Sequence, residues 1–324
     1  MNLRTNYLGI PLQHPLIIGS SSLTNDLAMV RELEDEGAAA LVLRSLYEEE
    51  IVDEQMDEFF HSEGHGEASP EASSYFPDAK VGLGPDEYLE HLRRVKEAVD
   101  IPVIASLCGT STCSWISYAQ LIEQTGADAV ELDLYHSASD AFTAAAEVET
   151  QMIEVVREVK QGLRIPVAAK LSPLFTAFAN FAGRLDAVGV NGLVVFTRFH
   201  KVDIDVVELE VVRAATLSDS SELQLRLRAA AALTGRVKAS IAIAGGVHTA
   251  LDVVKATMSG ANVTQLVSAI LKNGPRYLRT LRDELTEWMT TNEWNSLDEM
   301  RGNMSFQRIP NPAAYERAVY RSFH

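Results

Sequence analysis

Residues 165–196 read IPVAAKLSPLFTAFANFAGRLDAVGVNGLVVF and contain one complete repeat of the fold. The near-continuous apolar run Val167–Leu171 is typical of a strand covered on both faces, and the proline before it is tolerated at a strand start. An amphipathic helical pattern follows over Thr176–Val188, and Gly189 is the expected C-terminal cap. A second apolar strand, Gly192–Phe196, completes a β-α-β unit.

The same strand-then-helix pattern recurs along the chain. Near-continuous apolar runs predict eight strands, at Pro15–Gly19, Ala40–Leu43, Val103–Ser106, Ala129–Leu134, Val167–Leu171, Gly192–Phe196, Ser240–Ala244 and Asn262–Leu266. Helical patterns follow them at Asp26–Glu36, Pro85–Val99, Trp115–Gln124, Glu147–Lys160, Thr176–Val188, Leu225–Thr234, Leu251–Met258 and Ile270–Trp288. Eight units predict a single-domain α/β protein, a (β/α)8 TIM barrel over residues 1–295. A doubly wound sheet is the alternative, but its first turn is usually glycine-rich, and here that turn reads Ser20-Ser21-Ser22-Leu23.

Two insertions and a C-terminal extension interrupt the repeat. Residues 45–79, after the second strand, contain acids but no Lys or Arg, and form either a solvated loop or a lid. The histidines in this insertion, His61 and His65, lack apolar support for a metal site. The second insertion, Arg198–Glu222, follows the sixth strand and is also acidic. Residues 296–324 are rich in arginine and aromatic residues, and we expect them to pack on the barrel or on a partner.

Composition limits the class of partner. The chain has 324 residues and a formal net charge of −17, with 47% hydrophobic residues. These values exclude disorder as the main state and argue against nucleic acid or an anionic membrane as the main partner. They allow a small anionic substrate, because a pocket can be locally basic. Two cysteines, no signal-peptide pattern and no apolar run of the ~18–20 residues that cross a membrane together predict a cytoplasmic protein.

Three ionisable residues lie in predicted strands, near the C-terminal ends where TIM barrels keep their active sites. Lys170 ends the fifth strand, and Glu131 and Asp133 share one face of the fourth. A lysine buried without a partner is costly. Lys170 therefore either forms a Schiff base, binds an anion or stabilises charge on a cofactor, or it is the structural partner of an acid such as Asp133. For Asp133 a site role and a structural network with Lys170 both stay open.

Glycines after the seventh strand predict a phosphate site. Gly245 and Gly246 let backbone amides approach a ligand, and the helix that starts near Thr249 adds its positive end. With Ser268 after the eighth strand, this is where barrels often bind phosphate. A tight turn is the alternative.

Histidine and cysteine residues near the strand ends are less informative. His136 lies just past the fourth strand, where a lone histidine is either structural or catalytic. Cys108 and Cys113 have no second cysteine pair, so a zinc site is not expected. Each is a spare thiol or a reactive one.

Several of these segments together resemble the dihydroorotate dehydrogenase family, and most closely its soluble class 1 branch. The similarity runs from residue 1 to about residue 285 and rests on six segments: Tyr7-Leu8-Gly9, His14-Pro15-Leu16, Glu131-Leu132-Asp133-Leu134, Ala169-Lys170-Leu171-Ser172-Pro173, Ala244-Gly245-Gly246-Val247 and Ser259-Gly260-Ala261. It implies an FMN-dependent barrel that oxidises a C–C bond, as in the conversion of dihydroorotate to orotate in pyrimidine biosynthesis. It also implies a homodimer.

The resemblance implies a set of site residues at the C-terminal mouth of the barrel. The cofactor contacts carried over or nearest to the family positions are Ser20, Ser21, Arg44, Ser45, Ser106, Asp133, Lys170, Thr197, Gly245, Gly246, Val267 and Ser268. Lys170 would contact the N1/O2 edge of the flavin and offset the negative charge of its reduced form. The catalytic candidates are Lys170 and His136, with His136 as the base that removes a substrate proton.

The chain departs from the family at substrate-reading positions. The family's fourth-strand motif is Glu-Leu-Asn-Leu-Ser-Cys-Pro-Asn, in which cysteine is the base. Here His136 takes the cysteine position, Asp133 replaces one asparagine and Ala138 replaces another. A carboxylate at 133 would repel an anionic orotate ring. Val267 replaces a glycine and crowds the phosphate.

These departures leave three interpretations. The first is an FMN-dependent dehydrogenase whose substrate has diverged from dihydroorotate. The second is a redox-inactive barrel that acts as a binding or assembly subunit. The third is a lyase that uses Lys170 as a Schiff base. Because no iron–sulfur ligand set and no quinone-linked membrane helix occur in this sequence, we expect a soluble acceptor or a separate electron-transfer subunit.

Overall fold

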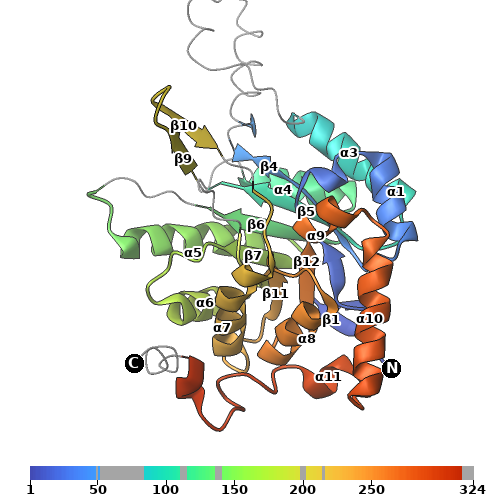
Figure 1. Cartoon of the computed structure of the whole chain (residues 1–324). Helices are drawn as coiled ribbons and strands as arrows, with labels where there is room; N and C mark the ends of the chain where they lie inside the picture. Colours follow the sequence, from blue (N-terminus) through green and yellow to red (C-terminus); the bar gives the residue numbers. More distant parts are fainter. Residues whose placement is uncertain are drawn as a thin grey trace, which may run out of the picture.

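The computed structural model describes residues 1–48, 50–51, 84–109, 115–135, 141–197, 202–213 and 216–315. Eight parallel strands form a closed barrel, each paired with its neighbours in chain order (Figure 1). They are β3 (Leu16–Ile18), β4 (Leu41–Tyr47), β5 (Val103–Cys108), β6 (Ala129–Leu134), β7 (Val167–Leu171), β8 (Gly192–Val195), β11 (Ser240–Ala244) and β12 (Val263–Leu266). Pairing of β12 with β3 closes the barrel, and the predicted TIM-barrel fold is confirmed.

Helices cover the outside of the barrel. They are α1 (Leu27–Asp35), α3 (Pro85–Ala98), α4 (Trp115–Thr125), α5 (Ala145–Gly162), α6 (Phe178–Ala187), α7 (Leu223–Leu233), α8 (Ala250–Ser259), α9 (Ser268–Asn273) and α10 (Tyr277–Thr291). The prediction of one helix over Ile270–Trp288 was wrong. Gly274, at φ +79°, ends α9, and Pro275 follows it before α10 begins. A left-handed glycine followed by proline stops a helix even where the apolar pattern continues.

A short hairpin closes the N-terminal end of the barrel. Strands β1 (Thr5–Tyr7) and β2 (Ile10–Leu12) pair antiparallel, and the side chains of Tyr7 and Leu8 are buried in the barrel interior. A Cβ on Gly192 of β8 would lie 2.4 Å from a methyl of Leu8. Gly192 therefore has no side chain because Leu8 fills that space.

The insertion after β8 carries regular structure that the sequence did not predict. Strands β9 (Val202–Asp205) and β10 (Glu210–Arg213) form an antiparallel hairpin that projects from the barrel at the upper left of Figure 1. A 3-10 turn, η2 (Ser220–Glu222), follows and leads into α7. Strands of four residues are too short to show a clear alternation of apolar and polar side chains. The sequence therefore indicated only an acidic insertion.

The described part of the C-terminal extension lies against the barrel helices. It contains α11 (Leu297–Met300) and a 3-10 turn, η3 (Pro312–Tyr315). The backbone amides of Gly302 and Phe306 donate to carbonyls of α8 and α7, respectively. None of the helices in the described residues is long and apolar enough to span a membrane.

His14 makes folding stability sensitive to acid. Its side chain is buried, and its Nδ1 accepts a hydrogen bond from the backbone amide of Leu16 at 3.3 Å. Burial, with the charge of Arg282, lowers the pKa of His14 from 6.5 to about 4. Between these values the unfolded chain binds the proton and the folded chain does not. The free energy of unfolding should therefore fall as pH drops from 6.5 to about 4, by up to about 3 kcal/mol from this group.

Urea titrations across this pH window test the role of His14. His14→Gln removes the titrating group, so its stability should depend on pH less steeply than that of the wild type, even though the variant is less stable at neutral pH. Parallel pH profiles for the two proteins would show that other groups cause the acid sensitivity.

Candidate active site at the barrel mouth

A cavity of about 290 Å³ lies at the C-terminal ends of the strands. Loops after four strands contribute its walls, which consist of Gly19, Ser20, Ser21, Ser22, Lys170, Phe196, Leu217, Ser218, Glu222, Arg226, Ala244, Gly245, Gln265, Val267, Ser268 and Leu271. Six of the residues singled out from the sequence thus meet at one cavity: Ser20, Ser21, Lys170, Gly245, Val267 and Ser268. This end of a TIM barrel is where active sites are found.

Lys170 lies at the centre of a buried polar network beneath the cavity. Its Nζ is 3.2 Å from Oε1 of Glu131 and 3.7 Å from Oδ2 of Asp133. The hydroxyl of Thr197 donates to Oδ2 of Asp133 at 2.8 Å, and Nε2 of Gln265 donates to Oε2 of Glu131 at 2.6 Å. Strands β6, β7 and β12 thus supply one cation, two acids and an amide, and Thr197 joins them from just past β8. The structural pairing left open for Lys170 is present.

The electrostatics of this network keep Lys170 charged. Burial alone would lower the pKa of Lys170, but the carboxylates of Glu131 and Asp133 raise it above its usual value. Burial raises the pKa of Asp133, although Lys170 and Thr197 oppose the shift. Within the described residues, Oδ1 of Asp133 and Oε1 of Gln265 are buried without a hydrogen-bond partner. The site therefore combines a fixed ammonium with two acceptor atoms that are not satisfied.

Serine hydroxyls form a chain beside the network. The hydroxyls of Ser20 and Ser45 are 3.1 Å apart, and those of Ser45 and Ser106 are 2.8 Å apart. The phenol of Tyr88 accepts from the amide of Ser106 and donates to its carbonyl. Of these three hydrogen-bonded serines, only Ser20 lines the cavity. Ser45 and Ser106 lie below Ser20 and fix its position.

Arg44 is not among the residues that line the cavity. Its guanidinium pairs with Glu50 and lies over the ring of Tyr47. The charge of Arg44, which the resemblance implies as a cofactor contact, is therefore partly neutralised by a neighbouring acid.

Two glycines and a serine lie at the predicted phosphate position. Gly245 and Gly246 have φ of +82° and +75°, and a Cβ on Gly246 would lie 2.6 Å from the backbone nitrogen of Leu223. Ser268 begins α9, and its hydroxyl accepts from the amide of Ser218 at 3.1 Å. Only glycine fits at position 246, because a side chain there would meet the backbone of Leu223.

Sequence reasoning missed four residues at this position. Ser218 accepts from the Gly246 amide at 3.4 Å and hydrogen bonds to Nε2 of His248 at 3.1 Å, and its carbonyl accepts from Nζ of Lys272 at 2.8 Å. Arg226, which is 7% exposed, donates to the Ala244 carbonyl that precedes the two glycines. Arg226 was recognisable as a charge on the apolar face of its helix, three residues after Leu223. Nothing local distinguishes Lys272 or Ser218 from surface residues.

Some predicted residues lie outside the described structure. They are His136, the base candidate, with Ala138, and also Arg198, Cys113, His61 and His65. Cys108 is buried in β5. Among the described residues, no group of three or more His, Cys, Asp or Glu is arranged to hold a metal.

Comparison with known proteins places this barrel in a family. Residues 81–289 match the family described as dihydroorotate dehydrogenase. A putative dihydroorotate dehydrogenase A (fumarate) of Aeropyrum pernix is 29% identical over 68% of this chain and 74% of its own length. The catalytic subunit of dihydroorotate dehydrogenase B (NAD(+)) of Thermoplasma acidophilum is 26% identical over 93% of this chain and 98% of its own length. The corresponding subunit of Methanocaldococcus jannaschii is 24% identical over 89% and 93%. The chain belongs to the dihydroorotate dehydrogenase family, whose members are oxidoreductases that act on a CH–CH bond.

Proposed function

We propose that this protein is an FMN-dependent dehydrogenase that oxidises a C–C bond of a small anionic, dihydroorotate-like substrate. The proposal rests on two features that occur at one cavity. The first is a buried lysine, Lys170, that two acids keep charged. The second is the phosphate cradle, by which we mean Gly245, Gly246 and Ser268. A fixed cation beside the ring of a flavin favours its negatively charged reduced form. Phosphate at the other end needs backbone donors and positive charge.

The chemistry of the donor set fits a flavin mononucleotide. Gly245, Gly246 and Ser268 would hold the phosphate, and Arg226 and Lys272 would supply positive charge there. Lys170 would face the ring edge, and Ser20 and Ser21 would approach the ring from the first strand. When bound, a flavin supplies the acceptor for a hydride from substrate.

The chain's own residues have three tasks in this mechanism. Lys170 stays protonated and fixes positive charge at the cavity floor. Asp133, with its unsatisfied Oδ1, offers a hydrogen-bonding group in place of the family asparagine. His136 is proposed as the base, because an imidazole titrates near neutral pH and so can accept a proton from substrate.

The test of substrate and base is anaerobic mixing of the FMN-loaded protein with dihydroorotate, followed through the visible flavin band. We expect slow bleaching in the wild type, faster bleaching in Asp133→Asn because the repelling carboxylate is gone, and at least ~100-fold slower bleaching in His136→Ala. Unchanged reduction in His136→Ala would remove His136 from the base role. No bleaching in either the wild type or Asp133→Asn would exclude dihydroorotate as substrate.

The lyase interpretation is disfavoured by the charge of Lys170. Schiff-base formation requires a neutral amine to attack a carbonyl. Two carboxylates within 3.7 Å favour the ammonium form instead. The redox-inactive interpretation makes a different prediction, because such a barrel would not retain FMN.

The β9–β10 hairpin supports a homodimer. In its register Ile204 faces Val211, and both are about two-thirds exposed, whereas Asp203, Asp205 and Glu210 share the opposite face with Val212. An amphipathic ribbon with an exposed apolar face and two unpaired edges among the described strands can pack on a second copy.

We also propose that a separate electron-transfer subunit binds this protein, since several relatives are named as catalytic subunits. We propose a cytoplasmic location.

Light scattering tests the hairpin contact. Ile204→Asp with Val211→Asp should convert a dimer to a monomer while circular dichroism stays unchanged, because the substitutions place charge in the apolar interface. Asp203→Asn, on the opposite face of the same strand, should leave the dimer intact. A wild-type monomer, or a dimer that survives the double substitution, would exclude this interface.

A further inference from the structure

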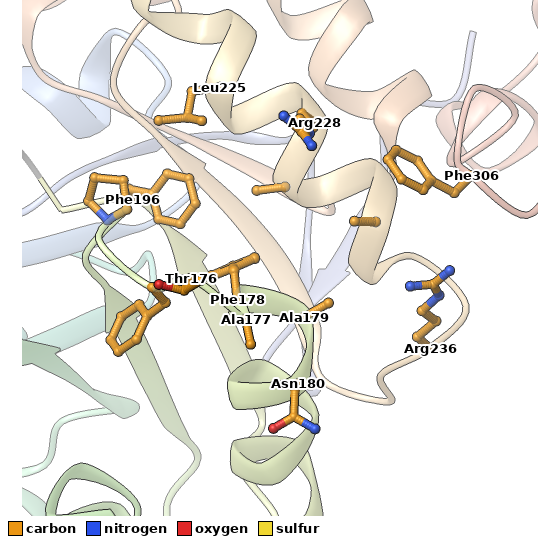
Figure 2. A pocket seen from close by; sticks show the side chains of 14 residues that line it. Thr176, Ala177, Phe178, Ala179, Asn180, Phe196, Leu225, Arg228, Arg236 and Phe306 are labelled. Atoms are coloured by element: carbon orange, nitrogen blue, oxygen red, sulfur yellow. The ribbon is translucent and has the colours of Figure 1, made fainter. Parts of the chain in front are cut away.

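A second hollow of the protein lies outside the barrel mouth, between α6 and α7. It has a volume of about 460 Å³, larger than the mouth cavity. Its walls are Pro173, Phe175, Thr176, Ala177, Phe178, Ala179, Asn180, Phe196, Leu225, Arg228, Ala229, Ala232, Arg236 and Phe306 (Figure 2). We name it the α6–α7 groove. Its volume is within the range of small-molecule sites.

The floor of the α6–α7 groove is aromatic. Phe178 and Phe196 pack edge to face with centroids 5.1 Å apart, and Phe175 stacks on Phe181 at 4.2 Å. Phe306, from the C-terminal extension, contributes to the wall beside α7 (Figure 2). Alanines on both helices leave the space between them unfilled. Such a floor binds a planar apolar body through offset and edge-to-face contacts.

Two arginines stand at this groove without acidic partners. Arg228 projects from α7 and Arg236 from the turn after it, and both line the groove (Figure 2). No residue in the described part of the chain forms an ion pair with either of them, whereas Arg226 of α7 pairs with Glu222 at 3.8 Å. In a chain of net charge −17, two unpaired cations beside an aromatic floor create a local site for an anion.

We propose that the α6–α7 groove binds an aromatic organic anion, with its ring on the phenylalanine floor and its acidic group at Arg228 or Arg236, which lie apart along the groove (Figure 2). Planar guanidinium groups suit carboxylate, sulfonate and phosphate oxygens, because they donate two parallel hydrogen bonds. A discrete hollow of this volume suits a small molecule rather than a long peptide. The site does not depend on a flavin, although Phe196 lines both this groove and the mouth cavity.

The test uses two fluorescent probes that differ in charge. 8-Anilino-1-naphthalenesulfonate carries a sulfonate, and N-phenyl-1-naphthylamine has the same rings without it. Arg228→Gln with Arg236→Gln removes the cation at either position, and should weaken binding of the sulfonate about five-fold, as expected for one exposed ion pair, and leave the neutral probe unchanged. Ala232→Phe should fill the groove and weaken both probes.

A matched control removes one arginine from a neighbouring surface. Arg157 lines the separate hollow between α5 and α6, so Arg157→Gln should leave the affinities for both probes unchanged. Circular dichroism confirms that each variant is folded. Equal affinity for the sulfonate in wild type, the double arginine variant and Ala232→Phe would overturn the proposal. So would displacement of the sulfonate by FMN with no effect of the groove variants, because the probe would then bind at the barrel mouth.

Discussion

Replacing Lys170 by methionine should cost about 3–5 kcal/mol of folding stability and abolish flavin reduction. The substitution removes the cation from a site where Glu131 is fully buried and Asp133 is nearly so. Two carboxylates then remain close together with no positive charge beside them. Breaking a buried ion pair by removing one partner is costly because the other charge stays desolvated.

The pH dependence of this variant is diagnostic. Without Lys170, burial and mutual repulsion should hold the folded pKa of the acid pair above its unfolded value. The folded state then binds more protons, so the stability of Lys170→Met relative to the wild type should rise as pH falls toward the ordinary carboxyl range. The wild type should gain less from this site, because Lys170 opposes the upward shift that burial causes in the pKa of Asp133.

A rescue variant separates charge from packing. Lys170→Met combined with Glu131→Gln and Asp133→Asn removes all three charges, and should recover most of the lost stability but none of the flavin reduction. Urea denaturation measures the first outcome and anaerobic reduction the second. A loss below about 1 kcal/mol in Lys170→Met, comparable to an exposed ion pair, would contradict the buried network.

Gly246→Ala should weaken FMN binding at least ~10-fold and cost about 1–3 kcal/mol of stability. The residue has φ of +75°, and its new Cβ would meet backbone atoms of Leu223 at 2.6 and 2.8 Å. Backbone cannot rotate away as a flexible side chain can. The turn after β11 or the start of α7 must therefore shift, and both carry residues of the phosphate cradle.

Gly189→Ala is the matched control for backbone strain. Gly189 has φ of +92°, and a Cβ there would meet no atom within 4 Å. It should therefore lose about 1 kcal/mol of stability from conformation alone and keep the wild-type affinity for FMN. Equal FMN affinities in the wild type and Gly246→Ala, measured by quenching of flavin fluorescence, would show that the cradle does not hold the phosphate.

The barrel could be predicted because each buried strand carries its own signal. β7 is an apolar run bounded by proline at its start and a polar turn at its end, and its predicted bounds agree with the structure. The α9–α10 boundary was missed because apolar periodicity continues through Gly274, although glycine followed by proline is a local stop. The β1–β2 hairpin was missed because strands of three residues are too short to show an alternation of apolar and polar side chains. Its role in closing the barrel is evident only from the contact between Leu8 and Gly192.

The site was predictable only where one residue conflicts with its surroundings. Lys170 is a charge in an apolar strand, and Gly245 and Gly246 form a glycine pair at a strand end, so both were found. Ser218 and Lys272 are ordinary in their own segments, and they converge only because β11 pairs with both β8 and β12, which brings the segment after β8 beside α9. The ion pair of Arg44 with Glu50 could not be predicted, because Glu50 lies six residues away in a segment whose path the sequence does not specify.

The most direct test of the central claim is whether the purified protein retains FMN. The protein is incubated with FMN, desalted, and its visible spectrum recorded, with Gly246→Ala and Gly189→Ala treated in parallel. We expect a flavin band near one equivalent per chain in the wild type and in Gly189→Ala, and a much weaker band in Gly246→Ala. A wild-type protein that folds normally but emerges colourless would contradict the proposed flavin site and favour a barrel without redox chemistry.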